Sequence, residues 1–376
     1  MQILAILAIF GKQKMHNKKF ILFISSENMK SLLKILIIIV LIHFEIGSEA
    51  KTKPVLKFNE NGKFKILQFT DIHYKYNSYR SDSALQMIIA AVKTEKPDLV
   101  VFTGDVVCTA ETKKAWLTFT KPFSDAKIPW TVVLGNHDIE YDLSGKQIME
   151  TITGLPYCLA ENGPEMIAGN GNYVLKVEAA DSHKATAVLY FLDSHSGLGK
   201  DSELGSYDWI KSNQIQWYID QSKQLTKDNN GNKYPALAFF HIPLPEYKEV
   251  WGREKTVGVK QEDVCSPDIN SGMYSAFLES GDVIGMFTGH DHNNNYIGYL
   301  HGICLAYGQA SGRESYGSIG KGYRVIELHQ GKRKFDSWVR IMHNCDREKD
   351  IWTPTGNMEK VNLVSFPESF IGETIK

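Results

Sequence analysis

Five apolar segments of this sequence are followed at once by Asp, Asn or His, the residue types that bind metal ions and transfer protons. The segments span residues 64–70, 99–103, 130–134, 236–240 and 283–288. The residues after them are Asp71, His73, Asp105, Asn136, His137, Asp138, His241, His290 and His292. Hard cations that must hold and activate water prefer carboxylate oxygen, amide oxygen and imidazole nitrogen. Seven such groups are supplied by Asp71, His73, Asp105, Asn136, His241, His290 and His292. Because Asp105 could bridge two ions through its two oxygens, this inventory predicts a two-metal site.

Each of these motifs is weak evidence when it is taken alone. An Asp-x-His pair is common, and an isolated Gly-Asp is usually a turn. A single His at a strand end, such as His241, is more often capped or solvated than coordinated. Five such motifs in one order, each at a strand end, are hard to produce by chance, so the joint pattern favours a metal site over separate structural roles.

The elements around the motifs must bring them to one place. The first three segments have the length of strands, and periodicity predicts helices over residues 83–94 and 112–126 between them. Open α/β sheets place their chemistry at the carboxyl ends of the strands. Alternate residues of an extended segment project to the same side, so Asp71 and His73, or His290 and His292, are expected to reach one cavity.

The rest of the chain predicts further strands and helices. Helices are expected at residues 145–153 and 212–225, and strands at 173–178, 185–192, 296–300, 303–307, 323–328 and 335–342. Alternating strands and helices followed by a strand-rich half predict an α/β fold with two sheets packed face to face and helices outside. The loop-rich stretch 141–172 is expected to lie over the active site. No repeat or linker interrupts the chain, so residues 51–376 are interpreted as a single domain.

Composition limits the classes of function. The 376 residues are 43% hydrophobic and carry a formal net charge of -1, values that are typical of a globular protein. Without a basic excess, no nucleic-acid partner is expected. The five cysteines, which have long irregular spacings and no CxxC pair, argue against a zinc knuckle and reveal no disulfide pairing. They are Cys108, Cys158, Cys265, Cys304 and Cys345.

The first 50 residues differ from the rest and predict a leader, with Met29 as the true start. Lys30 and Lys34 precede the apolar run 35–44, and small residues up to Ala50 offer a cleavage site. The apolar run is about half as long as a membrane span requires. The expectation is therefore export to a periplasm, the secretory pathway or the medium, with membrane contact only through the leader; an N-terminal anchor is the alternative.

The ordered motifs resemble those of the calcineurin-like metallophosphoesterase superfamily, and within it the purple-acid-phosphatase-like branch. The motifs that carry the resemblance are Asp71-x-His73, Gly104-Asp105, Gly135-Asn136-His137-Asp138, His241 and Gly289-His290-x-His292. The resemblance spans roughly residues 64–340 and implies a four-layer α/β/β/α sandwich of two packed mixed sheets with flanking helices.

The resemblance also implies two metal ions per chain, which would be iron, zinc or manganese. It assigns the first metal to Asp71, His73, Asp105 and His292, and the second to Asp105, Asn136, His241 and His290. The sequence departs from purple acid phosphatases at two positions, because Cys108 stands where they carry an iron-binding tyrosine and His73 where they have no histidine. No purple chromophore is therefore expected.

The function that this resemblance implies is hydrolysis of a small-molecule phosphate ester, most simply a phosphomonoester, by a metal-bound hydroxide. His137 would stabilise charge or protonate the leaving oxygen, and Asp138 would orient His137 by accepting its other ring proton. Arg313 and His195 are candidate substrate contacts, against the alternatives of a surface charge and a solvated loop histidine.

Three other functions remain open at this point. The same metal site would serve a phosphodiesterase or a pyrophosphohydrolase. A non-catalytic binding module on the same scaffold is the alternative from a different class of protein. The sequence predicts neither the substrate nor the oligomeric state.

Overall fold

The computed structural model describes residues 53–253, 256–342 and 359–365, without the side chains of the last range. The predicted leader, residues 1–50, and Cys345 lie outside the described residues. Within the described part of the chain, no helix combines the length and the apolar character that a membrane span requires. Export therefore stays a prediction.

The first sheet is built around three parallel strands that carry the first three motifs. These are β1 (Lys63–Phe69), β2 (Leu99–Thr103) and β3 (Trp130–Val133). Every residue of β2 is buried, as expected for a parallel strand that is covered on both faces. Three antiparallel strands extend the sheet on the other side of β1, in the order β12-β11-β10-β1-β2-β3. They are β10 (Lys321–His329), β11 (Phe335–Met342) and β12 (Glu359–Ser365).

The second sheet carries the two histidine motifs and has the order β4-β5-β6-β7-β9-β8. Its strands β5, β6, β7 and β9 are parallel, while β4 and β8 pair antiparallel at its two edges. The strands are β4 (Tyr173–Glu178), β5 (Ala185–Phe191), β6 (Ala236–Phe239), β7 (Val283–Thr288), β8 (Ile297–Leu300) and β9 (Ile303–Tyr307). Both sheets are mixed, as predicted.

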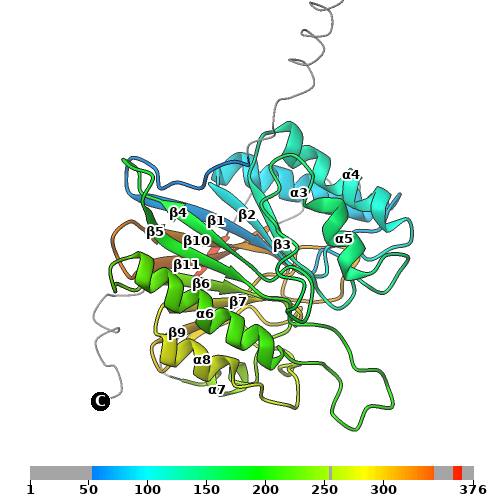
Figure 1. The fold of residues 1–376 in the computed structure, drawn as a ribbon. Coiled ribbons are helices and arrows are strands. Elements are labelled where there is room, and N and C mark those ends of the chain that lie inside the picture. Colours follow the sequence, from blue (N-terminus) through cyan, green and yellow to red (C-terminus); the bar gives the residue numbers. More distant parts are fainter. Residues whose placement is uncertain (1–52, 254–255, 343–358, 366–376) are drawn as a thin grey trace, which may run out of the picture. The chain divides into compact units, whose positions relative to one another are not determined.

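Helices cover the outer faces of the two sheets, which pack against each other (Figure 1). Helices α3, α4 and α5 lie on one side, and α6, α7 and α8 on the other. An aromatic ladder fills the space between the sheets: the rings of Phe191, Phe239 and Phe287 stack in turn, and Phe287 meets Phe335 of β11 with centroids 5.7 Å apart. The predicted four-layer sandwich is confirmed. The helices are α3 (Tyr79–Glu95), α4 (Thr112–Asp125), α5 (Gly145–Ile152), α6 (Ser212–Asp228), α7 (Tyr247–Val250) and α8 (Met273–Ser280).

The sequence does not predict α7, α8 and β12, and it starts α3 four residues late. Helix α8 spans only eight residues, too few for periodicity to show. Tertiary packing stabilises it, because Phe277 is fully buried and its ring meets Tyr218 of α6 with centroids 4.8 Å apart.

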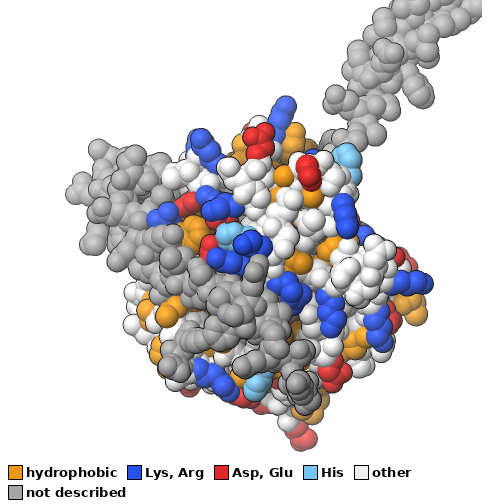
Figure 2. Space-filling model, turned by 90° about the vertical axis from the view of Figure 1, so that its left-hand side faces the viewer, with side chains coloured by type: hydrophobic (Ala, Val, Ile, Leu, Met, Phe, Trp, Pro, Cys, Tyr) orange, Lys and Arg blue, Asp and Glu red, His pale blue; other side chains and the backbone are white. Residues whose placement is uncertain are grey.

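One face of the molecule bears prominent basic side chains. Figure 2 shows the left-hand side of the view in Figure 1, where Lys and Arg side chains lie among neutral and hydrophobic ones. The formal net charge of the chain is nonetheless -1. The expectation that the protein has no nucleic-acid partner stays a prediction.

Candidate metal centre

The carboxyl ends of β1, β2, β3, β6 and β7 meet at one edge, where the two sheets are tied together by hydrogen bonds. Gln68 Nε2 of β1 donates to the carbonyl oxygen of Thr288 at the end of β7 (3.0 Å). His241 Nδ1, after β6, donates to the carbonyl oxygen of Thr103 at the end of β2 (2.7 Å). These bonds hold the strand-end residues of both sheets close together around a common space.

The backbone at this edge is not extended. Four of the predicted ligands have a left-handed conformation, with φ of +53° at Asp71, +50° at His73, +51° at Asp105 and +78° at His290. Non-glycine residues rarely adopt this region, and they do so mainly at functional sites. The predicted reason for the convergence of Asp71 and His73, alternation along an extended segment, is therefore wrong, because sharp turns direct these side chains.

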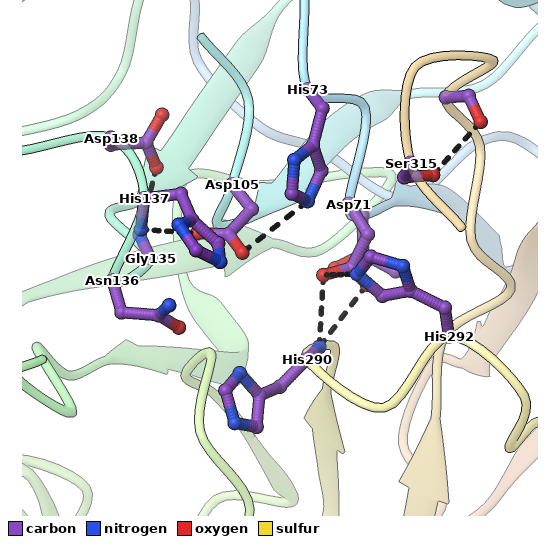
Figure 3. Close-up of polar contacts among 12 residues, drawn as sticks. Asp71, His73, Asp105, Gly135, Asn136, His137, Asp138, His290, His292 and Ser315 are labelled. Atoms are coloured by element: carbon purple, nitrogen blue, oxygen red, sulfur yellow. Dashed lines mark hydrogen bonds and ion pairs between the residues drawn. The ribbon is translucent and has the colours of Figure 1, made fainter. Parts of the chain in front are cut away.

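The first group of possible metal donors consists of Asp71, His73, Asp105 and His292, whose ligand atoms all lie within 4.8 Å of one another. His292 Nε2 is 3.3 Å from Asp71 Oδ1, and His73 Nε2 is 3.5 Å from Asp105 Oδ2. His292 Nδ1 donates to the carbonyl oxygen of Tyr316 (3.2 Å). That bond fixes the tautomer of His292 and leaves Nε2 as the atom that faces the group (Figure 3).

The second group shares Asp105 with the first and adds His241 and His290, again within 4.8 Å. The amide oxygen of Asn136 lies 3.2 Å from His241 Nε2 and so belongs to the same space. Nε2 of His290 is buried and has no hydrogen-bond partner among the described residues. An orphaned imidazole nitrogen beside a buried carboxylate is what a missing cation would leave.

The charges of the site also fit a cation. Burial raises the pKa of Asp71, but the imidazole of His292 outweighs it and brings the pKa to about 2. Burial lowers the pKa of His241, but Asp105 and then Asp71 raise it to about 10. Burial, together with His241, brings the pKa of His290 to about 3. The buried carboxylates therefore need positive charge beside them, which metal ions would supply when bound.

His137 lies beside the first group, with its ring centroid 5.2 Å from that of His73. Its Nδ1 pairs with Glu140 Oε2 at 2.8 Å, and both side chains are about half exposed. Burial lowers the pKa of His137, but the carboxylates of Asp105 and Glu140 raise it above its ordinary value.

Asp138 does not orient His137, which corrects the prediction. One of its carboxylate oxygens accepts from the amides of Val106 (2.9 Å) and Val107 (2.8 Å), and the other accepts from Gly135 (2.8 Å). Figure 3 shows this carboxylate directed away from the imidazoles. Because a fully buried carboxylate takes the hydrogen bonds that its loop offers, Asp138 stabilises the turn that presents Asn136.

Glycine is required at the start of that turn. A Cβ atom on Gly135 would lie 2.3 Å from Asp105 Oδ1 and 2.4 Å from the Asp105 amide nitrogen. The absence of a side chain therefore allows the shared carboxylate to sit against the turn, and the amide of His137 donates to the same oxygen (2.8 Å).

The structure places the two candidate substrate contacts outside the donor groups. Arg313 Nη1 donates to the Ser83 hydroxyl of α3 (3.2 Å). His195 Nε2 pairs with Gln214 Oε1 (2.7 Å), and His195 lines a cavity of about 180 Å³ together with Gly135. Their roles toward a substrate stay predictions.

Cys108, at the position of the iron-binding tyrosine, is buried in the same region. Burial, followed by the charge of Asp105, raises the pKa of its thiol well above the ordinary value. The side chain is therefore a neutral thiol at this position.

Sequence reasoning missed three residues around the site. Glu140 carries a local signal, since it lies three residues after His137 and can meet it across a turn. Tyr207 packs perpendicular to the ring of His290, with centroids 4.6 Å apart, and Tyr316 stacks on His292 at 4.0 Å. Both tyrosines come from loops, and no spacing in the sequence links them to the histidines.

The fold and the donor groups together define a class of protein, in which two packed sheets of an α/β fold present two sets of metal-type ligands at one edge. Residues 64–294 match the sequence pattern described as calcineurin-like phosphoesterase, and the chain belongs to this family. The resemblance inferred from the motifs is thus confirmed, and the family fold implies a dinuclear metal site.

Relatives agree with this assignment, and a solved structure agrees with the fold. The chain is 36% identical over 324 residues to probable inactive purple acid phosphatase 14 of Arabidopsis thaliana, covering 76% of this chain and 80% of the relative. It is 32% identical over 332 residues to phosphatase DCR2 of Saccharomyces cerevisiae, and this match covers 77% of this chain and 57% of the relative. A dimetal phosphatase from Danio rerio has the same fold, with a TM-score of 0.51 at 12% identity over 80% of this chain and 98% of that one.

Proposed function

We propose that this protein hydrolyses phosphate esters, with a preference for phosphomonoesters, at a centre that binds two metal ions. The observation that carries the proposal is the pair of donor groups that share Asp105. One carboxylate between two sets of nitrogen and oxygen donors is the arrangement that holds two cations close together.

Each donor group would hold one of the two ions. Asp71, His73 and His292 would face one ion, Asn136, His241 and His290 the other, and Asp105 both. When bound, two such ions activate water for attack on phosphorus and offset charge on the phosphoryl oxygens.

His137 supports the proton-transfer part of the proposal. Because Glu140 pairs with Nδ1, the other ring nitrogen, Nε2, is available to the substrate. The ring is partly exposed beside His73, so Nε2 can donate to a phosphoryl oxygen or to the leaving oxygen. Asp138 holds the turn and takes no part in this transfer.

The word inactive in the names of plant relatives belongs to those proteins. In this chain the donor set is complete, and the ring of His137 has its carboxylate partner. A binding module without catalysis would have no need of either feature, so we propose an active enzyme. A phosphodiesterase would use the same groups, and the substrate assay distinguishes the two.

The test uses the full chain, purified and analysed for metal content, with p-nitrophenyl phosphate and bis(p-nitrophenyl) phosphate as substrates. About two metals per chain and faster turnover of the monoester support the proposal, and preference for the diester favours the rival. Asp105→Asn should abolish turnover and lower the metal content. Asp125→Asn, which removes an exposed carboxylate paired with Lys121 on α4, is the control. Absence of turnover in a protein that contains both metals would refute the proposal.

A further inference from the structure

A hairpin between β5 and α6 stands at the second donor group. Residues 196–208, here named the site hairpin, are closed at the base by antiparallel pairing of Gly197 with Tyr207. Leu198 N donates to the Ser206 carbonyl (3.0 Å), and Asp208 N donates to the Ser196 carbonyl (2.9 Å). Figure 1 shows this green segment extending from the body of the protein. The ladder fixes both legs of the hairpin where they pass the site.

Each leg of the site hairpin contacts a residue of the second donor group. Ser196 Oγ donates to the carbonyl oxygen of Asn136 (3.3 Å). The ring of Tyr207 meets the ring of His290 at 88°, with centroids 4.6 Å apart. The base of the hairpin is therefore positioned by the same residues that would hold the second metal.

The Tyr207 hydroxyl has no hydrogen-bond partner among the described residues. A phenol keeps its proton at neutral pH, so this hydroxyl is available as a hydrogen-bond donor.

Tyr316 provides an internal comparison. Its ring stacks on His292 of the first donor group, at 4.0 Å between centroids, but its hydroxyl donates to Glu262 Oε2 (2.8 Å). Thus two tyrosines pack on the two histidines of the Gly-His-x-His motif, and only the one from the site hairpin has an uncommitted hydroxyl in the described structure.

We propose that Tyr207 is a further substrate-binding residue, whose hydroxyl donates a hydrogen bond to a phosphoryl oxygen held beside His290. This inference rests on the proposed phosphoesterase function. His137 lies beside His73 of the first group, whereas Tyr207 lies beside His290 of the second. The two donors thus serve different sides of the phosphoryl group. A neutral donor fixed beside an anionic oxygen stabilises the charge without a change of protonation.

The test compares Tyr207→Phe with Tyr234→Phe in the full-length protein as purified with its metals. Tyr234 is a partly buried tyrosine just before the amino end of β6, at the opposite end of that strand from the donor groups. Both variants keep the aromatic ring and remove one hydroxyl. Binding of inorganic phosphate is measured by titration calorimetry, alongside metal content and hydrolysis of p-nitrophenyl phosphate. We expect Tyr207→Phe to weaken phosphate binding and to lower kcat/KM by about tenfold each. Tyr234→Phe should stay within about twofold of the wild type in both, and the metal content should be unchanged in both variants.

The outcomes separate this inference from the proposed function. Wild-type hydrolysis that persists in Tyr207→Phe, with phosphate affinity unchanged, would overturn the role of Tyr207 alone. A metal-containing wild type that neither binds phosphate nor hydrolyses the ester would overturn both. Loss of metal from Tyr207→Phe would show that the tyrosine supports His290 rather than the substrate, and would also overturn the inference.

Discussion

Gly135→Ala is a small change that tests the geometry of the shared carboxylate. The added Cβ would lie 2.3 Å from Asp105 Oδ1 and 2.4 Å from the Asp105 amide nitrogen. Unstrained heavy-atom contacts need about 3.5 Å, so Asp105 must move by about 1 Å. Because one of the atoms in conflict belongs to the backbone, rotation of the Asp105 side chain cannot relieve the overlap.

The expected loss of metal follows from that displacement. Metal sites tolerate ligand distances within about 0.2 Å of their preferred values, so a shift of about 1 Å removes Asp105 as a common ligand. Overpacking costs about 1–3 kcal/mol of the free energy of unfolding, which for a domain of this size lowers Tm by a few degrees. We therefore expect a folded protein that has lost metal and turnover.

Metal analysis, thermal denaturation with and without chelator, and p-nitrophenyl phosphate hydrolysis test this expectation. Gly154→Ala is the matched control, because a Cβ there would meet no heavy atom within 4 Å. Wild-type metal content and turnover in Gly135→Ala would refute the reasoning, since Asp105 would then not need its observed position.

Two further predictions concern Glu140 and Lys321. Glu140→Gln should keep both metals but lower turnover by about tenfold. The loss should be larger for alkyl than for p-nitrophenyl esters, because alkoxide leaving groups depend more on proton donation by His137. An equal loss for both esters, or no loss, would contradict this. Burial lowers the pKa of Lys321 from 10.5 to about 8. Between these pH values the unfolded chain therefore binds more protons than the folded one. The free energy of unfolding should rise with pH in this range, by up to about 3 kcal/mol. Urea denaturation at pH 8 and pH 10 should show that Lys321→Met loses this increment, and an unchanged difference between the two pH values would disprove it.

Local patterns in the sequence predicted most of the fold and the donor set. The apolar run before Asp105 is buried along its whole length, and the one before Asp71 is buried from Ile66 onward. Both form strands because these side chains are covered on both faces of a sheet. The donor residues were found because each follows its strand directly. Helix α8 was missed because its stability comes from Phe277 packing on Tyr218, a contact between residues far apart in the sequence.

The errors at the site have the same cause. Asp138 was paired with its neighbour His137 in the prediction, but its oxygens accept from Val106 and Val107, about thirty residues earlier. The contact of Tyr207 with His290 likewise depends on how the site hairpin folds across the sheet edge. Sequence spacing identifies which side chains can bind metal, whereas the partners of each carboxylate and the loop aromatics depend on tertiary structure.

The left-handed backbone at Asp71, His73, Asp105 and His290 bears on the evolution of the chain. Each of these residues costs about 1 kcal/mol relative to glycine, which adopts the same conformation freely. A lineage released from selection for catalysis would gain stability by replacing them, so glycine should spread at these four positions among descendants that no longer need the chemistry. In this chain all four positions carry a side chain rather than glycine, a cost that metal binding would offset.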